Sequence, residues 1–364
     1  MIECVNPLSD RRWDAAIASS PEASFFHTST WARVLHETYS FSPTYFMDGP
    51  EISDGSAGLR PAAERVTDPR SRPSSPALLP MMEIDSWLTG RRGASLPFTD
   101  ECEPLCADPE AFSSLFKTAI THGKSRRWRS IEFRGGHGWP APPRPAVTFY
   151  GHRLDFAKDP VALFNQLDSS VRRAVRKAEQ SGLTVEFSTS LATMRDFYHL
   201  LGKTRQRHGV PPQPFRFFEN IQHHVLAAGK GTLVLARQGS VPVAGAVYLH
   251  SGKTVIYKFG ASDEAFQHLR GNNLVMWRAI EWFARNGFEG MDFGRTSLGN
   301  DGLRRFKLSW GTTERSIHYF KYDLSSDSFV TSHDQASGWH NRVFRILPRS
   351  VSQWIGTALY KHIA

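Results

Sequence analysis

Three strand-like runs follow one another in the second half of the chain, and they constrain the fold more than any other feature. The runs are GTLVLARQ, VPVAGAVYLH and TVIYKFGAS, which begin at Gly231, Val241 and Thr254. Only GS and SGK separate them, and such short connections containing glycine join antiparallel neighbours. The sequence therefore predicts an antiparallel meander here.

Helical and strand-like runs surround the meander and recur in the first half. A helix over GNNLVMWRAIEWFARNG and a strand over EGMDFG follow it, which gives an α+β unit. The first half alternates FFHTSTWARVLHETY, PALLPMMEI, DPEAFSSLFKTAITHG and WRSIEFRG in the same manner, with Asp108 as a helix cap. Because 364 residues exceed one ordinary core, we expect two α+β domains in series.

Composition shifts place the domain boundaries. Residues 49–75 are rich in Gly, Pro, Ser and charge, and are expected to form a mobile loop inside a first domain over 1–145. The run GWPAPPRP over 138–145 reads as a linker. A second domain is predicted over 146–325. Residues 326–364 form a basic tail, which we expect to be helical and to pack back on the body. The alternative is that this tail makes peripheral contact with a membrane.

A net charge of +9 indicates a phosphate-bearing partner: nucleic acid, a nucleotide cofactor or an anionic membrane face. The N-terminus lacks the apolar core of a secretory signal, so we expect a cytoplasmic protein, at the inner face of the membrane if the tail binds it. Three cysteines are too few for a disulfide framework, and the CEPLC pair, Cys102 and Cys106, predicts no metal site.

Two basic segments stand out. In VRRAVRKAEQSG, an apolar stripe of Val171, Ala174, Val175 and Ala178 opposes Arg172, Arg173, Arg176 and Lys177, with Ser169 or Ser170 as the cap. Those cations indicate either a bound anion or a solvated face. Arg205, Arg207 and His208 end a later helix, where they complement its dipole or contact substrate, and His208 could act as a base.

Further residues are expected to border a cleft. Tyr257 could present its hydroxyl at a groove, on the same strand face as Val255 and Phe259. Arg270, Gly271, Asn272 and Asn273 precede a helix, where backbone N–H groups can hold a phosphate.

The segment DFGRTSLGNDGLRRFKLSWG combines a strand end with a basic turn. A strand finishing at Gly294 would release Arg295 and Ser297 at its carboxyl end, where open sheets keep ligands. Phe306 and Trp310 can anchor the turn while Lys307 points elsewhere, which suits an ammonium beside a reacting carbonyl. We also expect Arg304 and Trp310 to contact substrate.

The motifs DFGR, G, FK and WG follow one another here, after RR..RKAE..G and YKFGAS. With these motifs in this order, the chain resembles the FemAB-like branch of the GNAT acyltransferase superfamily. That branch includes Fem-type aminoacyltransferases that build peptidoglycan bridges and relatives linked to exopolysaccharide loci. The resemblance extends to FFHTSTWARVLHETY and SLPFTDECEPL, and so covers most of the chain. It implies two tandem GNAT-like domains with mixed, mainly antiparallel sheets flanked by helices.

The resemblance also implies roles for residues. Lys307 would assist acyl transfer, Arg205 or Arg207 would contact substrate phosphates, and Tyr257 would line the cleft. The GNAT turn that holds the pyrophosphate of CoA needs glycine where QHLRGNN has Arg270 and Asn272, and the long helical arm of some Fem enzymes is missing. The donor therefore stays open between acyl-CoA and aminoacyl-tRNA, and no bound cofactor is assigned.

The favoured function is transfer of an acyl or aminoacyl group to an amine of a phosphate-bearing cell-envelope or exopolysaccharide precursor. A direct transfer requires no Ser or Cys nucleophile; the oxyanion needs a donor, for which Lys307 is the candidate. Two alternatives are a CoA-dependent N-acetyltransferase of a small amine and a non-catalytic nucleic-acid-binding protein. No stable protein partner is inferred.

Overall fold

The computed structural model describes residues 1–49, 76–136, 142–157, 159–331 and 344–363. The predicted mobile loop over 49–75 lies outside these residues except for Gly49, and so do residues 138–141 of the predicted linker.

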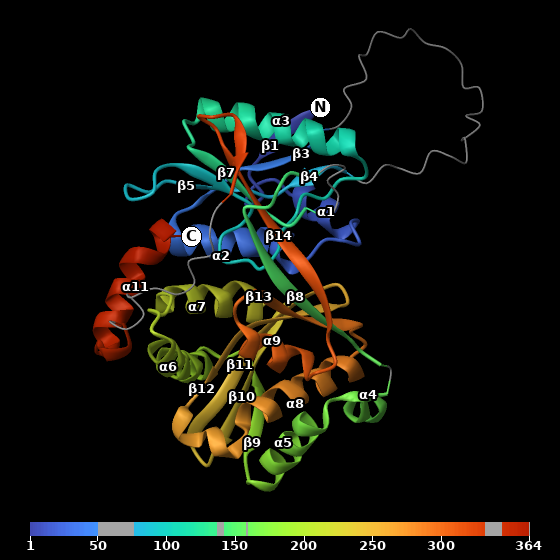
Figure 1. The fold of residues 1–364 in the computed structure, drawn as a ribbon, viewed down its shortest axis with the longest axis vertical. Helices are drawn as coiled ribbons and strands as arrows, with labels where there is room; N and C mark the ends of the chain where they lie inside the picture. The colour runs from blue at the N-terminus through green and yellow to red at the C-terminus, as the bar shows by residue number, and fades with distance from the viewer. Residues whose placement is uncertain (50–75, 137–141, 158, 332–343, 364) are drawn as a thin grey trace, which may run out of the picture.

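Helices and strands alternate along both halves, as the sequence predicts (Figure 1). The first half contains β1 (Ile2–Val5), α1 (Arg12–Ala18), η1 (Phe25–His27), α2 (Ser29–Tyr39), β2 (Ser42–Pro43), β3 (Tyr45–Asp48), β4 (Leu78–Leu79), β5 (Met82–Ile84), β6 (Arg92–Ala94), α3 (Pro109–Ser125) and β7 (Ser130–Arg134). The second half begins with β8 (Val147–Asp155), α4 (Pro160–Gln166), α5 (Ser169–Gln180), β9 (Thr184–Ser188), α6 (Leu191–His208), α7 (Phe215–Ile221) and η2 (Gln222–Leu226). It continues with β10 (Gly231–Gln238), β11 (Val241–Ser251), β12 (Thr254–Ser262), η3 (Glu264–Leu269), α8 (Gly271–Arg285), β13 (Gly290–Ser297), α9 (Asp301–Leu308), β14 (Thr313–Asp323), β15 (Ser328–Val330) and α11 (Arg349–Ile363).

One long sheet runs through both halves in the order β2-β5-β6-β7-β14-β8-β13-β12-β11-β10-β9. Among the described strands, only the pairs β6–β7 and β12–β13 are parallel. Each of these pairs is connected by a helix, α3 in the first half and α8 in the second. The prediction of a mixed, mainly antiparallel sheet is confirmed, and β10, β11 and β12 form the predicted meander.

The strand β14 joins the halves. It comes late in the chain, yet it lies between β7 and β8 and pairs antiparallel with both (Figure 1). The strand β15, which falls in the segment predicted to be a tail, pairs with β14. Sequence order and sheet order therefore differ most at the junction.

Local sequence signals account for several helices. The Asp108 carboxylate accepts a hydrogen bond from the Ala111 N–H at 2.8 Å and caps α3, as predicted. Val171, Val175 and Ala178 are buried on one side of α5, which confirms the apolar stripe. The predicted cap of α5 is wrong: Asp168 takes that place and accepts from the Ser170 N–H at 2.7 Å, because a carboxylate one residue earlier reaches the free amides.

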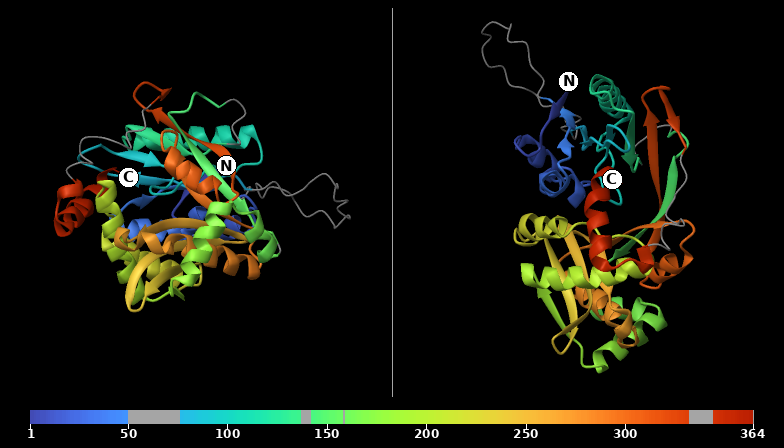
Figure 2. Two further views of the ribbon diagram at one scale, coloured as in Figure 1. Left: turned by 60° about the horizontal axis from the view of Figure 1, so that its bottom comes forward. Right: turned by 90° about the vertical axis from the view of Figure 1, so that its left-hand side faces the viewer.

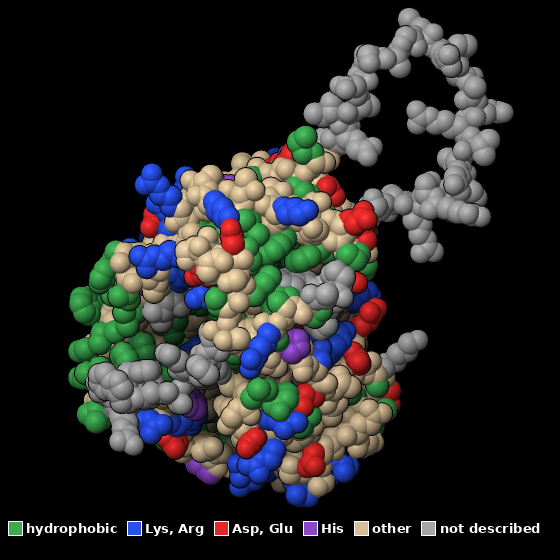
Figure 3. Space-filling model, turned by 45° about the horizontal axis from the view of Figure 1, so that its top comes forward, with side chains coloured by type: hydrophobic (Ala, Val, Ile, Leu, Met, Phe, Trp, Pro, Cys, Tyr) green, Lys and Arg blue, Asp and Glu red, His purple; other side chains and the backbone are tan. Residues whose placement is uncertain are grey.

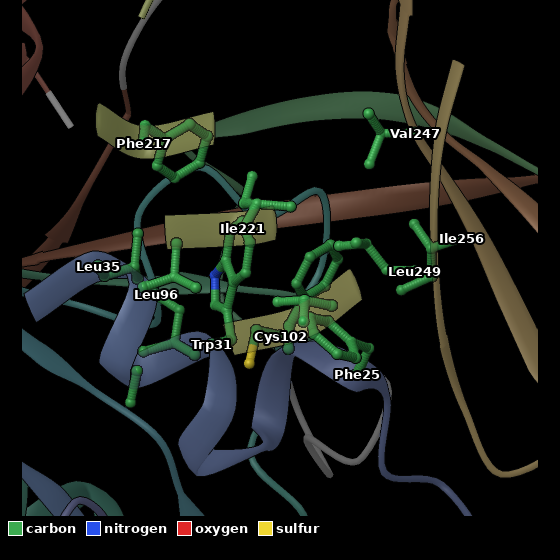
Figure 4. Close-up of a cluster of buried hydrophobic side chains, with 14 of the residues drawn as sticks. Phe25, Trp31, Leu35, Leu96, Cys102, Phe217, Ile221, Val247, Leu249 and Ile256 are labelled. Atoms are coloured by element: carbon green, nitrogen blue, oxygen red, sulfur yellow. The ribbon is translucent and has the colours of Figure 1, made fainter. Parts of the chain in front are cut away.

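A shared hydrophobic core lies between the two halves (Figure 4). Trp31 of α2, Phe217 of α7 and Ile256 of β12 belong to this cluster. The Trp31 and Phe217 rings meet edge to face with centroids 5.8 Å apart. Two further clusters lie beneath α3 and beneath α8.

The helix α11 packs against both halves, as its position across the junction in Figure 2 shows. The Tyr360 hydroxyl donates to the Pro211 carbonyl at 2.9 Å, and the Trp87 indole N–H donates to His362 at 3.1 Å. A Cβ at Gly356 would lie 2.1 Å from the Pro212 carbonyl oxygen, so glycine permits this close contact. In the described part of the chain, no helix combines the length and apolar character that crossing a bilayer requires.

Candidate active site

The strands β12 and β13 begin side by side and then separate. They pair in parallel at Thr254, Val255 and Ile256, and no further along β12. The strand β13 kinks after Asp292, where Gly294 has a φ of +70°, and it resumes pairing with β8 at Arg295. The predicted strand end at Gly294 is therefore wrong: glycine permits the left-handed residue inside a strand that continues to Ser297.

A cavity of about 290 Å³ lies beside this gap, on the side of α8. We call it the tyrosine cavity, because Tyr248 and Tyr257 line it. Its other lining residues include Thr204, Arg207 and His208 of α6, Ser262, Asn272, Met276 and, from α9, Leu303 and Phe306.

Tyr257 is held over the backbone of its own strand. A Cβ at Gly260 would lie 1.8 Å from the Tyr257 hydroxyl oxygen, so glycine makes room for the ring. Burial raises the pKa of Tyr257 to about 12, so the phenol stays protonated. Its predicted alignment with Phe259 is wrong, because Lys258 is an extra residue in the pairing with β11 and turns Phe259 to the opposite face.

Lys307 is buried behind the tyrosine cavity, 3% exposed. Its ammonium donates to the Gly294 carbonyl at 2.8 Å and to the Arg295 carbonyl at 3.0 Å, the two residues at the kink of β13. An ammonium carries three donors, so one remains beyond these two bonds in the described structure. Burial lowers the pKa of Lys307 to about 8, against the opposing charges of Asp100 and Asp292.

Asp100 lies on the other side of Lys307. Its carboxylate accepts from the Lys258 ammonium at 2.8 Å. Burial disfavours the charged carboxylate, but Lys258, Arg295 and Lys307 outweigh burial and hold the pKa of Asp100 below its usual value. Asp100 was not singled out from the sequence, although it lies in the quoted segment SLPFTDECEPL.

A second cavity of about 290 Å³ opens on the opposite face of β12. We call it the carboxylate cavity, because Glu22, Asp100, Glu101, Glu103 and Asp292 line it, together with Arg153 and Arg315. Arg315 forms an ion pair with Glu101. Ile256 lines this cavity and its neighbour Tyr257 lines the tyrosine cavity, because successive strand residues point to opposite faces.

The basic residues predicted at the end of α6 do not all line the same cavity. Arg207 and His208 line the tyrosine cavity, whereas Arg205 reaches the Gln213 side-chain oxygen at 3.5 Å and does not line it. Partial burial lowers the pKa of His208, and the charges of Arg207, Arg205 and Arg345 lower it further. His208 is therefore neutral at neutral pH, as a proton acceptor must be.

A third cavity, of about 490 Å³, adjoins the tyrosine cavity and shares Arg207 and Ser262 with it. We call it the arginine cavity, because Arg345 and Arg349, which precede and begin α11, line it with Lys203 and Arg207. Asp263 also lines it and forms an ion pair with Lys203.

The start of α8 borders the tyrosine cavity. Arg270 adopts the left-handed conformation with a φ of +61° and lies at the N-cap. Gly271 is buried, Asn273 is half-buried, and the Asn272 amide donates to the Ser262 hydroxyl at 3.0 Å. The Asn273 N–H donates to the Arg270 carbonyl at 3.0 Å, so an anion at this helix start would contact the N–H groups that precede Asn273.

The remaining predicted residues lie apart from the tyrosine cavity. The guanidinium of Arg295 lies over the Phe149 ring, 4.4 Å from its centroid. Arg304 makes two hydrogen bonds to Glu314, at 2.7 and 2.8 Å. Trp310 is fully buried, and Ser297 ends β13. The cations of the 292–311 segment are thus divided among several partners.

Two other buried groups near Lys307 were not predicted as site residues from the sequence. One is Lys258, which pairs with Asp100 and whose side chain is 7% exposed. His152 of β8 is fully buried, and its Nε2 lies 3.1 Å from the Glu314 carboxylate. Burial and the charge of Lys307 lower the pKa of His152, so a neutral imidazole lies close to the ammonium. A lone His in a strand carries no signal of such a position.

The geometry brings the protonated Lys307 ammonium and the Asp100 carboxylate to the gap between β12 and β13, with a cavity on either face of β12. A buried ammonium can stabilise an oxyanion, because few waters compete for its hydrogen bonds. A carboxylate or a neutral imidazole nearby can accept a proton. This arrangement suits attack of an amine on an ester or thioester carbonyl.

Comparisons with known proteins agree with this fold. A family model described as an acetyltransferase (GNAT) domain matches residues 166–308. The UDP-N-acetylmuramoylpentapeptide-lysine N(6)-alanyltransferase of Weissella viridescens is 25% identical over 225 residues, which are 61% of this chain and 61% of that protein. The alignment thus spans less than two thirds of that relative.

Two solved structures resemble the chain over most of its length. The crystal structure of FemX has a TM-score of 0.63 at 16% identity and covers 90% of this chain and 98% of its own. A tandem GNAT protein from the clavulanic acid biosynthesis pathway has a TM-score of 0.53 at 8% identity, covering 89% and 98%. These likenesses show the fold, which is a tandem arrangement of GNAT-like units.

Proposed function

Because the chain is a FemAB-like protein of the GNAT superfamily, with its acetyltransferase domain at residues 166–308, we propose that it transfers an acyl or aminoacyl group to an amine. The acceptor that we propose is a phosphate-bearing precursor of the cell envelope or of an exopolysaccharide. The observation that carries the proposal is the buried Lys307 ammonium, at a strand gap that two cavities flank from opposite faces.

The proposed reaction is a direct transfer. The nitrogen of the acceptor amine attacks the donor carbonyl carbon, the bond from that carbon to oxygen or sulfur breaks, and the amine loses one proton. Lys307 would donate its remaining N–H to the oxyanion, and Asp100 or His208 would receive the proton from the amine and return it to the departing oxygen or sulfur. A positioned oxyanion donor of this kind contributes about 100- to 1000-fold to a rate.

The charges of the cavities suggest that different parts of the substrates bind in different cavities. Arg207, Arg345 and Arg349 at the arginine cavity offer guanidinium groups that match phosphates. The carboxylate cavity suits an ammonium group instead. An aminoacyl ester carries such an ammonium next to its carbonyl and a simple acyl thioester does not, which favours the aminoacyl donor.

One observation favours the alternative of a CoA donor. The start of α8, with Gly271 and Asn272, borders the tyrosine cavity, and free amides at a helix start can hold a pyrophosphate. We therefore keep acyl-CoA as the second donor class. Within the described residues, no cavity or helix start comparably favours the nucleic-acid-binding alternative.

A transfer assay tests the proposal. The purified protein is given alanyl-tRNA or acetyl-CoA with UDP-N-acetylmuramoyl pentapeptide or an amino-sugar precursor, and product is measured by mass spectrometry. Lys307→Met should lower the rate about 100-fold or more, because its volume is similar and the donor is lost. Lys253→Met is the matched control, since the Lys253 ammonium also donates to a carbonyl, at 3.1 Å, but on the surface. A folded Lys307→Met protein with the wild-type rate would refute the assignment.

A further inference from the structure

The two most exposed tryptophans of the described chain lie at α11 and beside it. Trp354 is 73% exposed, and Trp87 in the turn between β5 and β6 is 84% exposed. Ile346, Leu88 and Val351 add exposed apolar surface nearby. Figure 3 shows hydrophobic side chains gathered along the left-hand edge, the side on which Figure 1 places α11, with Lys and Arg side chains above and below. We call this surface the α11 face.

The orientation of α11 is fixed by contacts on its inner side. Ser352, Gly356, Tyr360 and His362 are buried against the body. The Thr89 hydroxyl donates to the His362 carbonyl at 3.0 Å, which ties the end of the helix to the β5–β6 turn. Trp354 therefore lies on the outer side of α11, because the buried residues named above occupy the inner side.

The two exposed indoles belong to, or lie beside, the same helix. Eight residues separate Trp354 from His362, which corresponds to about 12 Å along a helix. The Trp87 ring meets the His362 ring with centroids 5.5 Å apart. Trp87 therefore lies beside the last turn of α11, and Trp354 lies about two turns earlier on the exposed side of the same helix.

Basic residues predominate in the last segment of the chain. From Gln335 to Ala364 the sequence contains no Asp or Glu and four Lys or Arg. Arg345, Arg349 and Lys361 are exposed in the structure. In the adjacent turn, the acidic Asp85 forms an ion pair with Arg91 at 2.6 Å. Asp263 and Glu264 line the arginine cavity with Arg345 and Arg349, and Asp263 forms an ion pair with Lys203, so basic residues still outnumber acidic ones beside α11.

We propose that the α11 face binds the surface of an anionic lipid bilayer. Amphipathic indole rings are favoured at the boundary between headgroups and acyl chains, and basic residues around them are attracted to anionic headgroups. Large apolar side chains scattered singly need no such explanation, but these are grouped and bordered by cations. This proposal does not depend on the transfer reaction.

Binding through this face has a consequence for the cavities. Arg345 and Arg349 border the α11 face and also line the arginine cavity. The mouth of that cavity would therefore lie next to the lipid surface, where a lipid-borne phosphate could reach it.

Co-sedimentation with vesicles tests the proposal. The full chain is mixed with vesicles of phosphatidylcholine alone, or of phosphatidylcholine with about one-third phosphatidylglycerol, near physiological ionic strength. We expect binding to the second kind only, weakened when salt is raised to about 0.5 M. Protein that stays in the supernatant with both kinds would overturn the proposal.

Matched variants locate the surface. Trp354→Ser and the double variant Trp87→Glu/Trp354→Glu should lower the partition constant about tenfold or more, because indole burial is lost. Val161→Glu in α4 replaces another exposed apolar side chain and should bind as the wild type does. Arg345→Gln/Arg349→Gln should weaken binding several-fold, whereas Arg173→Gln/Lys177→Gln on α5 should not.

Two further outcomes would overturn the proposal. One is undiminished vesicle binding by a folded Trp354→Ser protein. The other is a dimer, detected by light scattering, that Trp354→Ser dissociates, because it would assign the α11 face to a second copy of the chain. Melting temperatures of all variants separate loss of binding from loss of fold.

Discussion

The same strand–helix–strand crossover occurs in both halves, yet only the second leaves an open gap. In the first half, β6 and β7 pair at Gly93 and Ala94, and the contact continues because the Ser95 N–H donates to the Glu132 carbonyl at 2.8 Å. In the second half, β12 and β13 part after Ile256, and cavities lie on both faces. One crossover is therefore suited to support the fold and the other to hold reactants.

The two crossovers also place their buried cations differently. The guanidinium of Arg134 fills the end of the first crossover, where it donates to Glu132 at 2.8 Å and to the Leu96 carbonyl at 3.1 Å. The Lys307 ammonium donates to two carbonyls at the edge of the second gap. Arg134 thus closes the end of the first crossover, whereas Lys307 is buried at a gap that cavities flank.

The largest expected effect comes from removing the carboxylate at the open gap. Asp100→Asn should lower kcat/KM about 100-fold or more, because the proton acceptor is lost and the charge beside Lys307 changes. It also leaves Lys258 buried without its partner, which destabilises the protein. Adding Lys258→Met should restore the melting temperature but not the activity. Recovery of activity in the double variant would show that Asp100 acts only by neutralising Lys258.

The pH dependence of activity gives the next largest effect. Lys307 has a pKa of about 8 in the folded protein and is protonated below it. If the ammonium stabilises the oxyanion, kcat should fall about tenfold per pH unit above that value. Lys307→Arg keeps its charge in alkaline solution and should lack this fall, whatever its maximal rate. A rate that rises through pH 8 and 9 would indicate a neutral Lys307 acting as a base.

Partly filling the open gap should have a moderate effect. Ala246 lines the tyrosine cavity, and Ala246→Leu would occupy part of its volume. We expect KM for one substrate to rise about tenfold, because added methylene groups exclude ligand atoms, while kcat changes less. A variant that binds both substrates with unchanged KM would remove the tyrosine cavity from the site.

The smallest effect on activity is expected in the closed crossover. Ser95→Ala removes the acceptor of the Arg134 N–H, which is bonded at 2.8 Å. A buried donor left without a partner costs about 1–3 kcal/mol, so the free energy of unfolding should decrease while kcat is preserved. Chemical denaturation and steady-state assays on one preparation measure both. A kcat that falls with little change in stability would mean that the first crossover also takes part in the reaction.

Features that depend on neighbouring residues were predictable from the sequence. The meander, the apolar stripe of α5 and the Asp108 cap follow from periodicity and capping over a few residues. The tandem GNAT-like fold followed from resemblance rather than from such patterns. Helix and strand ends were less predictable: the extra Lys258 in β12 and the kink at Gly294 depend on the strands alongside.

The candidate site depended on contacts between distant segments. Lys258 and Asp100 are 158 residues apart in sequence, and Arg345 and Arg349 reach the arginine cavity from the far end of the chain. No periodicity relates such pairs. Arg304 was expected to contact substrate, and its two bonds to Glu314 follow from the placement of β14, which local patterns do not reveal. The proposed roles of Lys307, His208 and Arg207 remain predictions.

The position of β14 bears on how the chain can be divided. Cleavage between residues 145 and 146 would leave β7 with a bare edge on one fragment and, on the other, a bare edge on the part of β14 that pairs with β7. Exposed edges of this kind associate, so neither fragment should be soluble alone. Produced together, the two should recombine noncovalently, which makes this boundary a natural point for a split reporter of assembly.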